Sequence, residues 1–283
     1  MSGTQACIGA RMSSRSRPPR RDPSAPIEAG RPRGLRACIL AGGLGTRLRS
    51  VVGDVPKALA PIGGRPFLDF ILRQLAANGI RRVTICTGYG RDRVRAFAGD
   101  GSVWGLEISY SEETTPLGTA GAIRQAWADF RDDQIIVLNG DTFFDVPIGE
   151  LAAHHRASGA AATMAVHETD AAGRFGEVVV GDHGDVVSFR ERSTTGRAVI
   201  NGGVYVLDRG VLDHIVPGQA ASLERDVFPA MTAKDRDSRG RNRRLSAVVF
   251  NGFFIDIGVP ADYDRLNADP RPVLRALADG ATC

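Results

Sequence analysis

The sequence is poor in the features that mark secreted or membrane-spanning proteins. It has four cysteines, none in a Cys-x-x-Cys spacing, and Cys38 and Cys86 lie inside apolar, strand-like runs. Such runs favour buried, reduced thiols, so we expect no disulfides and a cytoplasmic location. No stretch approaches the roughly 20 apolar residues that a membrane-spanning helix needs. The sequence therefore predicts no membrane insertion.

The folded body also lacks the excess of basic residues that nucleic-acid binding needs, although the whole chain has a net charge of +4. Residues 1–34 hold seven arginines and two acidic residues, which leaves 29 basic and 30 acidic residues elsewhere. This Arg-, Pro- and Ser-rich segment is expected to be disordered. The nearly neutral remainder argues against a nucleic-acid partner. Deletion of residues 1–33 would test the alternative that the segment itself binds nucleic acid.

The pattern of apolar residues after position 35 predicts the fold class. Strand-like runs alternate with helix-like segments: 37–40, 66–78, 83–87, 92–97, 106–110, 118–130 and 134–139. This alternation predicts a parallel sheet covered on both faces. After about residue 160, strands follow one another with few helices, which predicts an antiparallel or mixed extension. We expect an α/β, Rossmann-like, three-layer fold with a mixed, mainly parallel sheet, as one domain over 35–270 and a C-terminal tail at 271–283.

A glycine-rich turn follows the first predicted strand, and a lysine follows the turn. The turn comprises Leu40, Ala41, Gly42, Gly43, Leu44, Gly45, Thr46 and Arg47. Glycines let backbone N–H groups approach phosphate oxygens, and Arg47 adds a permanent positive charge. The spacing fits neither the P-loop nor the dinucleotide fingerprint, and such a turn alone is weak evidence. Lys57, which follows Pro56, is a second cation suited to stabilise charge at a reacting phosphorus.

These segments carry a resemblance to a known family. LAGGLGTRLR followed by PKAL is similar to the signature of the sugar-1-phosphate nucleotidyltransferases, which make NDP-sugars. Further motifs follow in the same order, so the resemblance covers about residues 36–268: PLGTAG at 116–121, NGD at 139–141, NGG at 201–203 and DIGVP at 256–260. It implies the glycosyltransferase-A-like form of the fold, with a sugar-binding antiparallel extension.

The resemblance also implies roles for single residues. Arg47, Lys57 and Asp141 are expected to be catalytic. The expected nucleotide-binding residues are Leu40, Ala41, Gly42, Gly43, Gly45, Thr46, Glu113, Gly118 and Thr119. Asp141 and Asp256 are expected to hold Mg²⁺, and chemistry supports this, because a carboxylate beside apolar strand residues is costly unless paired or metal-bound. Taken alone, Asp141 is also compatible with a turn or helix-capping role.

The sugar phosphate is expected to contact a separate set of residues: Gly140, Glu191, Arg192, Asn201 and Gly202. The family pattern F-x-E-K is replaced here by Phe189-Arg190-Glu191-Arg192, with Arg in the position of the Lys. Arg can still clamp a phosphate, although its reach and geometry differ. An exposed, charged hairpin is an almost equally good interpretation of Arg192.

Two adjacent histidines are not expected to bind a ligand. His154 and His155 follow Leu151 in a segment that we expect to be helical. Neighbouring residues on a helix do not share a face. We therefore interpret both histidines as surface residues.

The implied enzyme uses two small molecules, an NTP and a sugar 1-phosphate, with Mg²⁺ as its cofactor. A sugar-1-phosphate oxygen attacks the α-phosphorus of the NTP, and pyrophosphate leaves. The attacking phosphate is already ionised, so neither a general base nor a covalent intermediate is needed. Segments 48–62, 140–146, 200–205 and 252–263 most resemble the D-glycero-D-manno-heptose 1-phosphate guanylyltransferases. This implies GTP, a heptose 1-phosphate and a role in the synthesis of lipopolysaccharide or capsule.

Other functions remain open in the sequence. Mannose-1-phosphate guanylyltransferases are close alternatives, as are the uridylyl- or thymidylyltransferases of N-acetylmuramate or glucose 1-phosphate. A non-catalytic regulator that binds a nucleotide sugar is disfavoured, because Arg47, Lys57, Asp141 and Asp256 are all present. The oligomeric state is left open, with a homodimer as one option.

Overall fold

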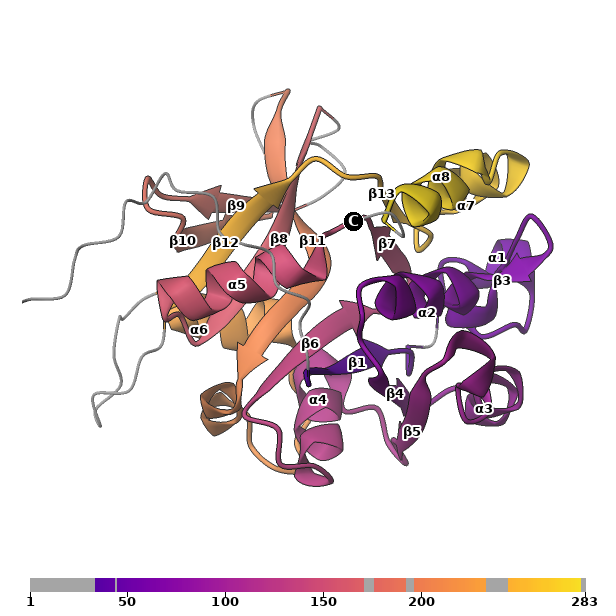
Figure 1. Cartoon of the computed structure of the whole chain (residues 1–283), viewed down its shortest axis with the longest axis horizontal. Coiled ribbons are helices and arrows are strands. Elements are labelled where there is room, and N and C mark those ends of the chain that lie inside the picture. The colour runs from indigo at the N-terminus through magenta and orange to yellow at the C-terminus, as the bar shows by residue number, and fades with distance from the viewer. Residues whose placement is uncertain (1–33, 44, 171–175, 192–195, 233–243, 281–283) are drawn as a thin grey trace, which may run out of the picture.

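A nine-stranded mixed sheet forms the centre of the molecule (Figure 1). The computed structural model describes residues 34–43, 45–170, 176–191, 196–232 and 244–280. The first part of the sheet is parallel, with neighbouring strands in the order β6 (Gln134–Asn139), β1 (Arg36–Leu40), β4 (Arg82–Thr87) and β5 (Glu107–Glu112). Each of these strands lies within two residues of its predicted position. The βα alternation in the sequence therefore predicted this half correctly.

The second part of the sheet is largely antiparallel. Its long strand β11 (Ala198–Asp208) runs antiparallel to β6, to β8 (Ala162–Thr169) and to β9 (Glu177–Val180). The outer strands are β10 (Val186–Arg190), antiparallel to β9, and β12 (Leu245–Phe250), parallel to β8. The register of β11 against β8 shifts between Asn201 and Val204, so Gly202 and Gly203 lie at a bulge. The predicted mixed sheet with an antiparallel extension is confirmed.

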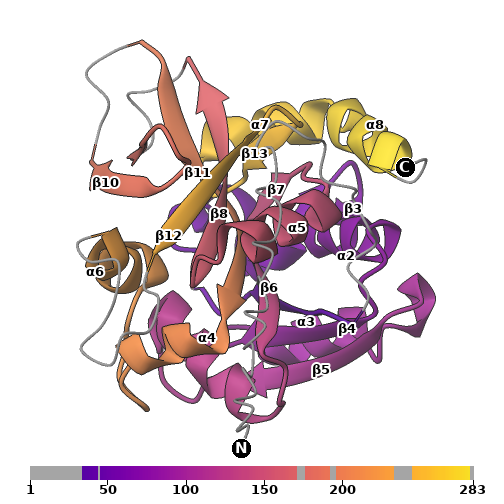
Figure 2. The same cartoon turned by 60° about the vertical axis from the view of Figure 1, so that its left-hand side comes forward.

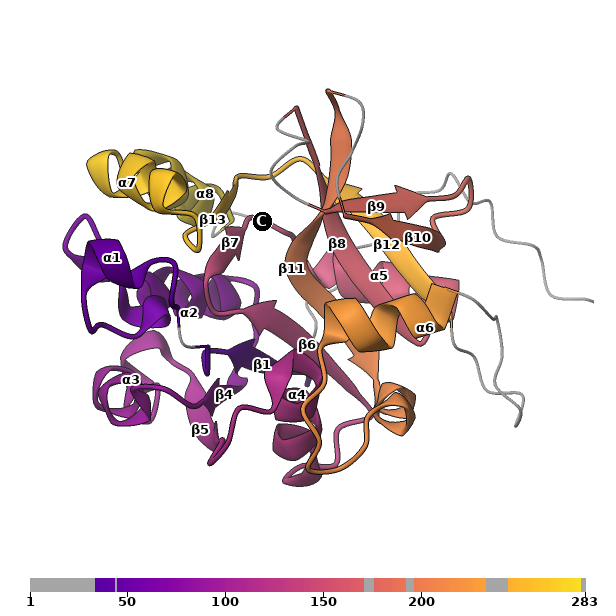
Figure 3. The same ribbon diagram turned by 180° about the vertical axis from the view of Figure 1, so that it is seen from behind.

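Helices cover both faces of this sheet, as Figures 1 and 3 show from opposite sides. One face carries α2 (Phe67–Ala77), α3 (Arg91–Ala98) and α5 (Ile148–Ser158), and the other carries α4 (Gly118–Ala128) and α6 (Phe228–Thr232). Successive strand residues point to opposite faces. Accordingly, Ala37 and Ile39 belong to one apolar core and Cys38 to the other. The result is the predicted three-layer arrangement.

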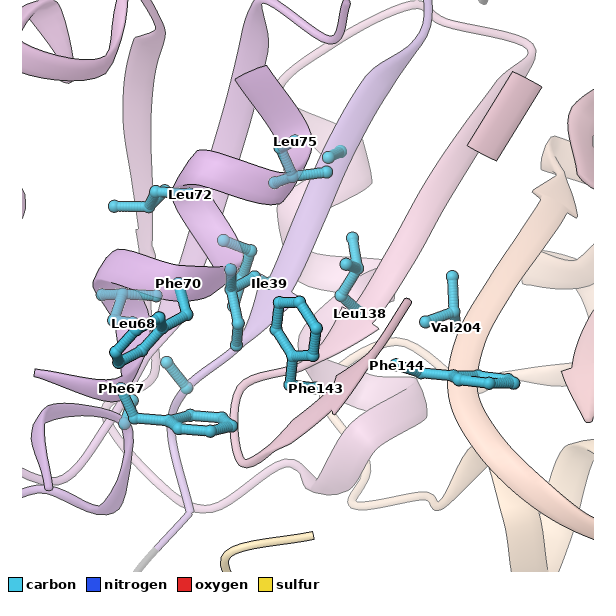
Figure 4. Packing of buried hydrophobic residues seen from close by; sticks show 14 of the residues in the cluster. Ile39, Phe67, Leu68, Phe70, Leu72, Leu75, Leu138, Phe143, Phe144 and Val204 are labelled. Atoms are coloured by element: carbon cyan, nitrogen blue, oxygen red, sulfur yellow. The ribbon is translucent and has the colours of Figure 1, made fainter. Parts of the chain in front are cut away.

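The larger core lies under α2 and holds the first strand in place. The helix begins after Pro66, whose fixed φ suits a helix start, and ends before Asn78 and Gly79. Figure 4 shows Phe67, Leu68 and Leu72 of α2 in one apolar cluster with Ile39 of β1 and Leu138 of β6. The fully buried β7 residues Phe143 and Phe144 extend the same core. The ends of β1 and β6, where the site lies, are thus fixed by apolar packing.

Short elements complete the chain. Strand β7 (Thr142–Phe144) pairs antiparallel with β13 (Phe254–Asp256), and β2 (Pro61–Ile62) pairs with β3 (Arg65–Pro66). Helix α7 (Pro260–Ala268) follows β13. None of the described helices is long and apolar enough to cross a membrane. Residues 1–33 lie outside the described part, so the expected disorder of the N-terminal segment stays a prediction.

The C-terminal segment differs from its expectation as a tail at 271–283. Arg271–Gly280 forms helix α8, which lies against α2 (Figure 2). Val273 and Ala276 are buried there, and Leu277 packs against the same core. Their spacing places them on one helix face, and Pro272 is tolerated because it stands in the first turn. The apolar stripe of Val273, Ala276 and Leu277 therefore makes this segment a packed helix.

Candidate functional site

A cavity of about 710 Å³ lies at the carboxyl ends of the parallel strands. This end of an open α/β sheet is where ligands bind, and the volume suits a nucleotide-sized molecule. Many of the residues predicted from the sequence line it: Leu40, Gly42, Gly43, Gly45, Thr46, Glu113, Gly118, Thr119 and Asp141. The motifs thus come together in space although they are spread over a hundred residues of sequence.

Glycine is suited to the positions of the turn after β1 for different structural reasons. A Cβ at Gly42 would lie 2.5 Å from Oε1 of Glu113, and a Cβ at Gly45, where φ is +57°, would lie 3.0 Å from Cβ of Lys57. Gly45 therefore needs glycine for its backbone conformation, whereas a side chain at Gly42 would require the Glu113 carboxylate to move. A Cβ at Gly43 would meet no heavy atom within 4 Å. Gly43 therefore leaves open space beside the backbone, as a phosphate-binding turn requires.

Lys57 joins two carboxylates at the edge of this cavity. Its Nζ lies 2.5 Å from Oδ2 of Asp141 and 3.8 Å from Oδ1 of Asp256. Asp141 follows β6, and Asp256 ends β13; the Ile257 N–H donates to the Asp141 carbonyl at 3.0 Å. A Cβ at Gly258 would lie 2.1 Å from Nζ of Lys57. Glycine in the DIGVP motif thus makes room for the lysine.

The electrostatics of this cluster favour a cation. Burial and the negative charge of Asp141 raise the pKa of Asp256, and the positive charges of Lys57 and Arg47 oppose this rise. Arg47 is exposed and does not line the cavity, but it is near enough to act on Asp256. The Gly258 N–H also donates to Oδ1 of Asp256 at 2.7 Å. Two carboxylates held together in this way need positive charge beside them.

The carboxylates of Asp141 and Asp256 suit a metal ion that the substrate helps to hold. Among the described residues, no group of three or more His, Cys, Asp or Glu side chains could hold a metal. Mg²⁺ commonly binds one or two carboxylates and completes its shell with substrate phosphates and water. Asp141 and Asp256 fit this pattern, because they lie beside the nucleotide-sized cavity and share the Lys57 ammonium. Two carboxylates are too few for a metal site made wholly of protein ligands.

Glu113 is held on another wall of the cavity. Its backbone N–H donates to the Thr87 carbonyl at 2.8 Å, and its Oε2 accepts from the Leu117 N–H at 2.8 Å. Burial raises the pKa of Glu113. Gly118, at the start of α4, has a φ of +68°, and a Cβ there would lie 2.5 Å from the Ala221 carbonyl oxygen. The wall is therefore a tightly specified turn with a half-buried carboxylate in it.

The residues predicted for the sugar phosphate are less compactly arranged. Gly140, Asn201, Gly202 and Glu191 lie in the described part of the chain, but they do not line this cavity. Glu191 is exposed just after β10. The two glycines have packing reasons: a Cβ at Gly140 would lie 2.6 Å from the Leu40 carbonyl oxygen, and one at Gly202 would lie 2.3 Å from Cδ1 of Phe144. Arg192 and the question it raises lie outside the described residues.

Several cavity residues were not predicted as site residues. Gly88, Tyr89 and Arg91 line the cavity from the end of β4, and Asn139 lines it from the end of β6. The Tyr89 hydroxyl donates to Asp54, and the Arg49 guanidinium lies 4.4 Å from the centre of its ring. The position of Gly88 and Tyr89 directly after a predicted parallel strand was an available signal. Asn139 belongs to the NGD motif at 139–141.

The interpretation of His155 as a surface residue is wrong. Its side chain is 1% exposed and lies 2.8 Å from Oγ1 of Thr163 and 3.1 Å from Oδ1 of Asp208. His155 faces the sheet from α5, whereas His154 is half-buried beside Ser246. The adjacent histidines do point in different directions, but one of these directions is the protein interior. Asp208 pairs with Gln134, the first residue of β6, so this contact is remote from the cavity.

Comparison with known proteins identifies the family. The chain matches the nucleotidyl transferase family over residues 36–270. The chain belongs to this family. It is 34% identical over 229 residues to the D-glycero-alpha-D-manno-heptose 1-phosphate guanylyltransferase of Campylobacter jejuni, covering 81% of this chain and 97% of that protein. It is 37% identical over 246 residues to the mannose-1-phosphate guanylyltransferase of Mycobacterium tuberculosis, covering 84% of this chain and 67% of that protein.

A solved structure agrees with this result. The crystal structure of HddC from Yersinia pseudotuberculosis complexed with GMP-PN is similar to this nucleotidyltransferase, with a TM-score of 0.72 and 30% identity. The similarity covers 83% of this chain and 98% of that one. The predictions of a nucleotidyltransferase enzyme and of its fold are therefore confirmed.

Proposed function

We propose that this nucleotidyltransferase transfers GMP from GTP to D-glycero-α-D-manno-heptose 1-phosphate. The products are pyrophosphate and a GDP-heptose for cell-surface glycan synthesis. The observation that carries the transfer chemistry is the cluster in which the Lys57 ammonium lies between Asp141 and Asp256, beside a nucleotide-sized cavity. Two carboxylates that can hold a metal ion and a lysine that can neutralise phosphate charge are the groups that metal-assisted nucleotidyl transfer uses.

The protein residues act mainly by position and charge. The open backbone at Gly43 would hold the GTP phosphates, and Lys57 and Arg47 would neutralise charge that develops on them during transfer. Asp141 and Asp256 would hold Mg²⁺, which supplies further neutralisation of the triphosphate and orients it when bound. The sugar 1-phosphate, placed beside Asn201 and Gly140, would attack the α-phosphorus as pyrophosphate leaves. No residue needs to accept a proton, because the attacking oxygen is already ionised.

The choice of GTP and a heptose 1-phosphate is supported by the relatives. Two relatives named D-glycero-alpha-D-manno-heptose 1-phosphate guanylyltransferase, from Campylobacter jejuni and Aneurinibacillus thermoaerophilus, are matched over 97% and 96% of their lengths. The similar crystal structure of HddC from Yersinia pseudotuberculosis is complexed with GMP-PN. A cytoplasmic location is supported by Cys38 and Cys86, which are buried free thiols.

Mannose 1-phosphate is the second candidate substrate. The relative named mannose-1-phosphate guanylyltransferase has 37% identity, somewhat more than the 34% of the relatives named for heptose. The chain covers 67% of that longer protein. The match spans nearly the whole length of the relatives named for heptose, which favours the heptose substrate. The percentage of identical residues, taken alone, favours mannose.

A pyrophosphate-release assay tests the proposal. The purified protein is supplied with Mg²⁺, each of GTP, ATP, CTP, UTP and dTTP, and a panel that includes heptose, mannose, glucose and N-acetylmuramate 1-phosphates. We expect the highest kcat/KM with GTP and the heptose 1-phosphate. A preference for GTP with mannose 1-phosphate would replace the heptose by the second candidate. Turnover with no pair would instead favour a non-catalytic nucleotide-sugar-binding protein.

A further inference from the structure

A network of hydrogen bonds connects the nucleotide cavity to the antiparallel extension. At its centre is Glu224, in a single π-helical turn that spans Leu223–Val227. Its Oε2 accepts hydrogen bonds from Oγ1 of Thr119 and from Oγ of Ser222, both at 2.9 Å. Its Oε1 accepts from the Tyr205 hydroxyl at 3.2 Å. Because Thr119 lines the cavity, Glu224 lies directly behind the nucleotide-facing surface.

The other end of the network is Asn201, at the bulge of β11. Its Nδ2 donates to the Tyr205 hydroxyl at 2.7 Å, and its Oδ1 accepts from the Gly203 N–H at 2.9 Å. Asn139 also hydrogen-bonds to the buried Tyr205 hydroxyl. Burial and the Glu224 carboxylate raise the pKa of Tyr205, so its hydroxyl keeps its proton and donates. Asn201 is therefore linked to Thr119 through two side chains, those of Tyr205 and Glu224.

Backbone contacts hold the same two segments together. The Leu223 N–H donates to Oγ1 of Thr119 at 2.8 Å, and the Ala120 N–H donates to the Ala221 carbonyl at 2.9 Å. Figures 2 and 3 show the segment before α6 beside α4. The absence of a side chain at Gly118 permits this approach. The start of α4 and the π-helical turn thus form one unit on which Glu224 is mounted.

We propose that Glu224 is a positioning residue for nucleotidyl transfer, which fixes Thr119 on the nucleotide side relative to Asn201 on the sugar side. The proposal rests on the proposed function, which places the sugar beside Asn201. A carboxylate that accepts three hydrogen bonds from side chains is a strong and directional anchor. Two substrates that react in line need this kind of control, because a displacement of about 1 Å can slow a reaction about 100-fold.

Three variants separate this role from a purely structural one. Glu224→Gln keeps the shape but replaces an acceptor with a donor, and Tyr205→Phe removes only the hydroxyl that connects Glu224 to Asn201. Asp132→Asn is the matched control. The Asp132 side chain is 13% exposed and pairs with Arg36 at 3.4 Å and Arg82 at 2.8 Å. These arginines begin β1 and β4, at the opposite end of the strands from the cavity.

The test measures kcat and both KM values with GTP and the sugar 1-phosphate that the wild-type protein prefers, together with melting temperatures. Calorimetry measures binding of α,β-methylene-GTP with and without that sugar 1-phosphate. We expect Glu224→Gln to lower kcat by about 10- to 100-fold. We also expect it to abolish the change in nucleotide affinity that the bound sugar phosphate causes. Tyr205→Phe should act in the same direction, with a loss of about threefold to tenfold. Asp132→Asn should lower the melting temperature alone.

The proposal is overturned if Glu224→Gln and Tyr205→Phe leave kcat and both KM values within about twofold of the wild type. A lower melting temperature with those unchanged rates would assign Glu224 a structural role. Failure of the wild-type protein to turn over any sugar 1-phosphate would overturn the proposed function and this proposal together. The wild-type rate therefore distinguishes the two failures.

Discussion

The parallel and antiparallel halves of the sheet build the surfaces proposed for the two substrates in different ways. In the parallel half, backbone turns at the ends of β1 and β4 face the cavity, with Gly43 as the most open position. In the antiparallel half, the surface proposed for the sugar depends on side chains such as Asn201, which donates to Tyr205, the residue that in turn donates to Glu224. A turn is specified by a few consecutive residues, whereas a side-chain network requires segments that are distant in sequence. The first half is therefore easier to predict than the second.

The charged cluster draws on segments outside both halves of the nine-stranded sheet. Lys57 comes from the glycine-rich segment, Asp141 from the end of β6, and Asp256 from β13 near the C-terminus. Neither half holds the cluster alone. The proposed transfer reaction thus requires that segments distant in the sequence be folded together.

The largest expected effect comes from Asp256→Asn, which tests whether the chemistry needs the C-terminal contribution. Asn keeps the size of the side chain but removes a charge that would hold Mg²⁺ against the phosphates. We expect kcat/KM to fall about 100- to 1000-fold. Pyrophosphate release at increasing Mg²⁺ concentration measures the loss, and higher Mg²⁺ should restore part of the rate.

The exposed Asp264 on α7 provides the control for this experiment. Asp264→Asn removes the same charge close by in sequence but away from Lys57, so its rate should stay at the wild-type level. Near-normal rates for Asp256→Asn would show that Asp141 suffices, and the reaction would then not depend on β13.

A smaller effect is expected from Gly43→Ala, which tests the backbone surface of the parallel half. A Cβ at this position meets nothing within 4 Å, so the free protein should keep its melting temperature. If phosphates approach the backbone here, the added methyl group should weaken GTP-analogue binding about tenfold, as expected for one lost hydrogen bond to a charged group.

Gly210→Ala is the matched control, because its Cβ would also meet nothing within 4 Å and Gly210 does not line the nucleotide cavity. It should change neither stability nor binding. Unchanged nucleotide affinity in Gly43→Ala would show that the phosphates bind elsewhere on the cavity wall.

The sequence predicted the elements and motifs whose physical basis is local. Strand β6 was predicted with its observed bounds, because the apolar run Gln134–Asn139 is bordered by turn residues on both sides. The convergence of Gly43, Glu113 and Asp141 on one cavity also followed, because each comes soon after a strand of the parallel sheet. The structure added that Lys57 already lies between the two carboxylates.

Other features could not be predicted because they depend on distant contacts. Thr119 and Glu224 are 105 residues apart in sequence, and nothing near Glu224 indicates that its carboxylate reaches the start of α4. His155 was misinterpreted for a related reason, because its partners Thr163 and Asp208 come from strands of the extension. Polar residues carry no periodic signal of burial, so the sequence does not reveal which of them enter such networks.

The smallest expected effect concerns stability in the parallel half and the half-buried Glu113. Burial raises its pKa above the ordinary 4.5, so its contribution to stability is present below that value and is lost as the pH rises through the raised pKa. At pH 7, Glu113→Gln should therefore stabilise the free protein, by less than about 1 kcal/mol because solvent screens the group.

Glu112→Gln is the control of opposite sign, because a hydrogen bond from Arg95 lowers the pKa of Glu112. Melting temperatures should thus rise for Glu113→Gln and fall slightly for Glu112→Gln at pH 7, and both differences should disappear in acid. A loss of stability in Glu113→Gln would mean that this carboxylate supports the cavity wall, as Glu224 supports the antiparallel side.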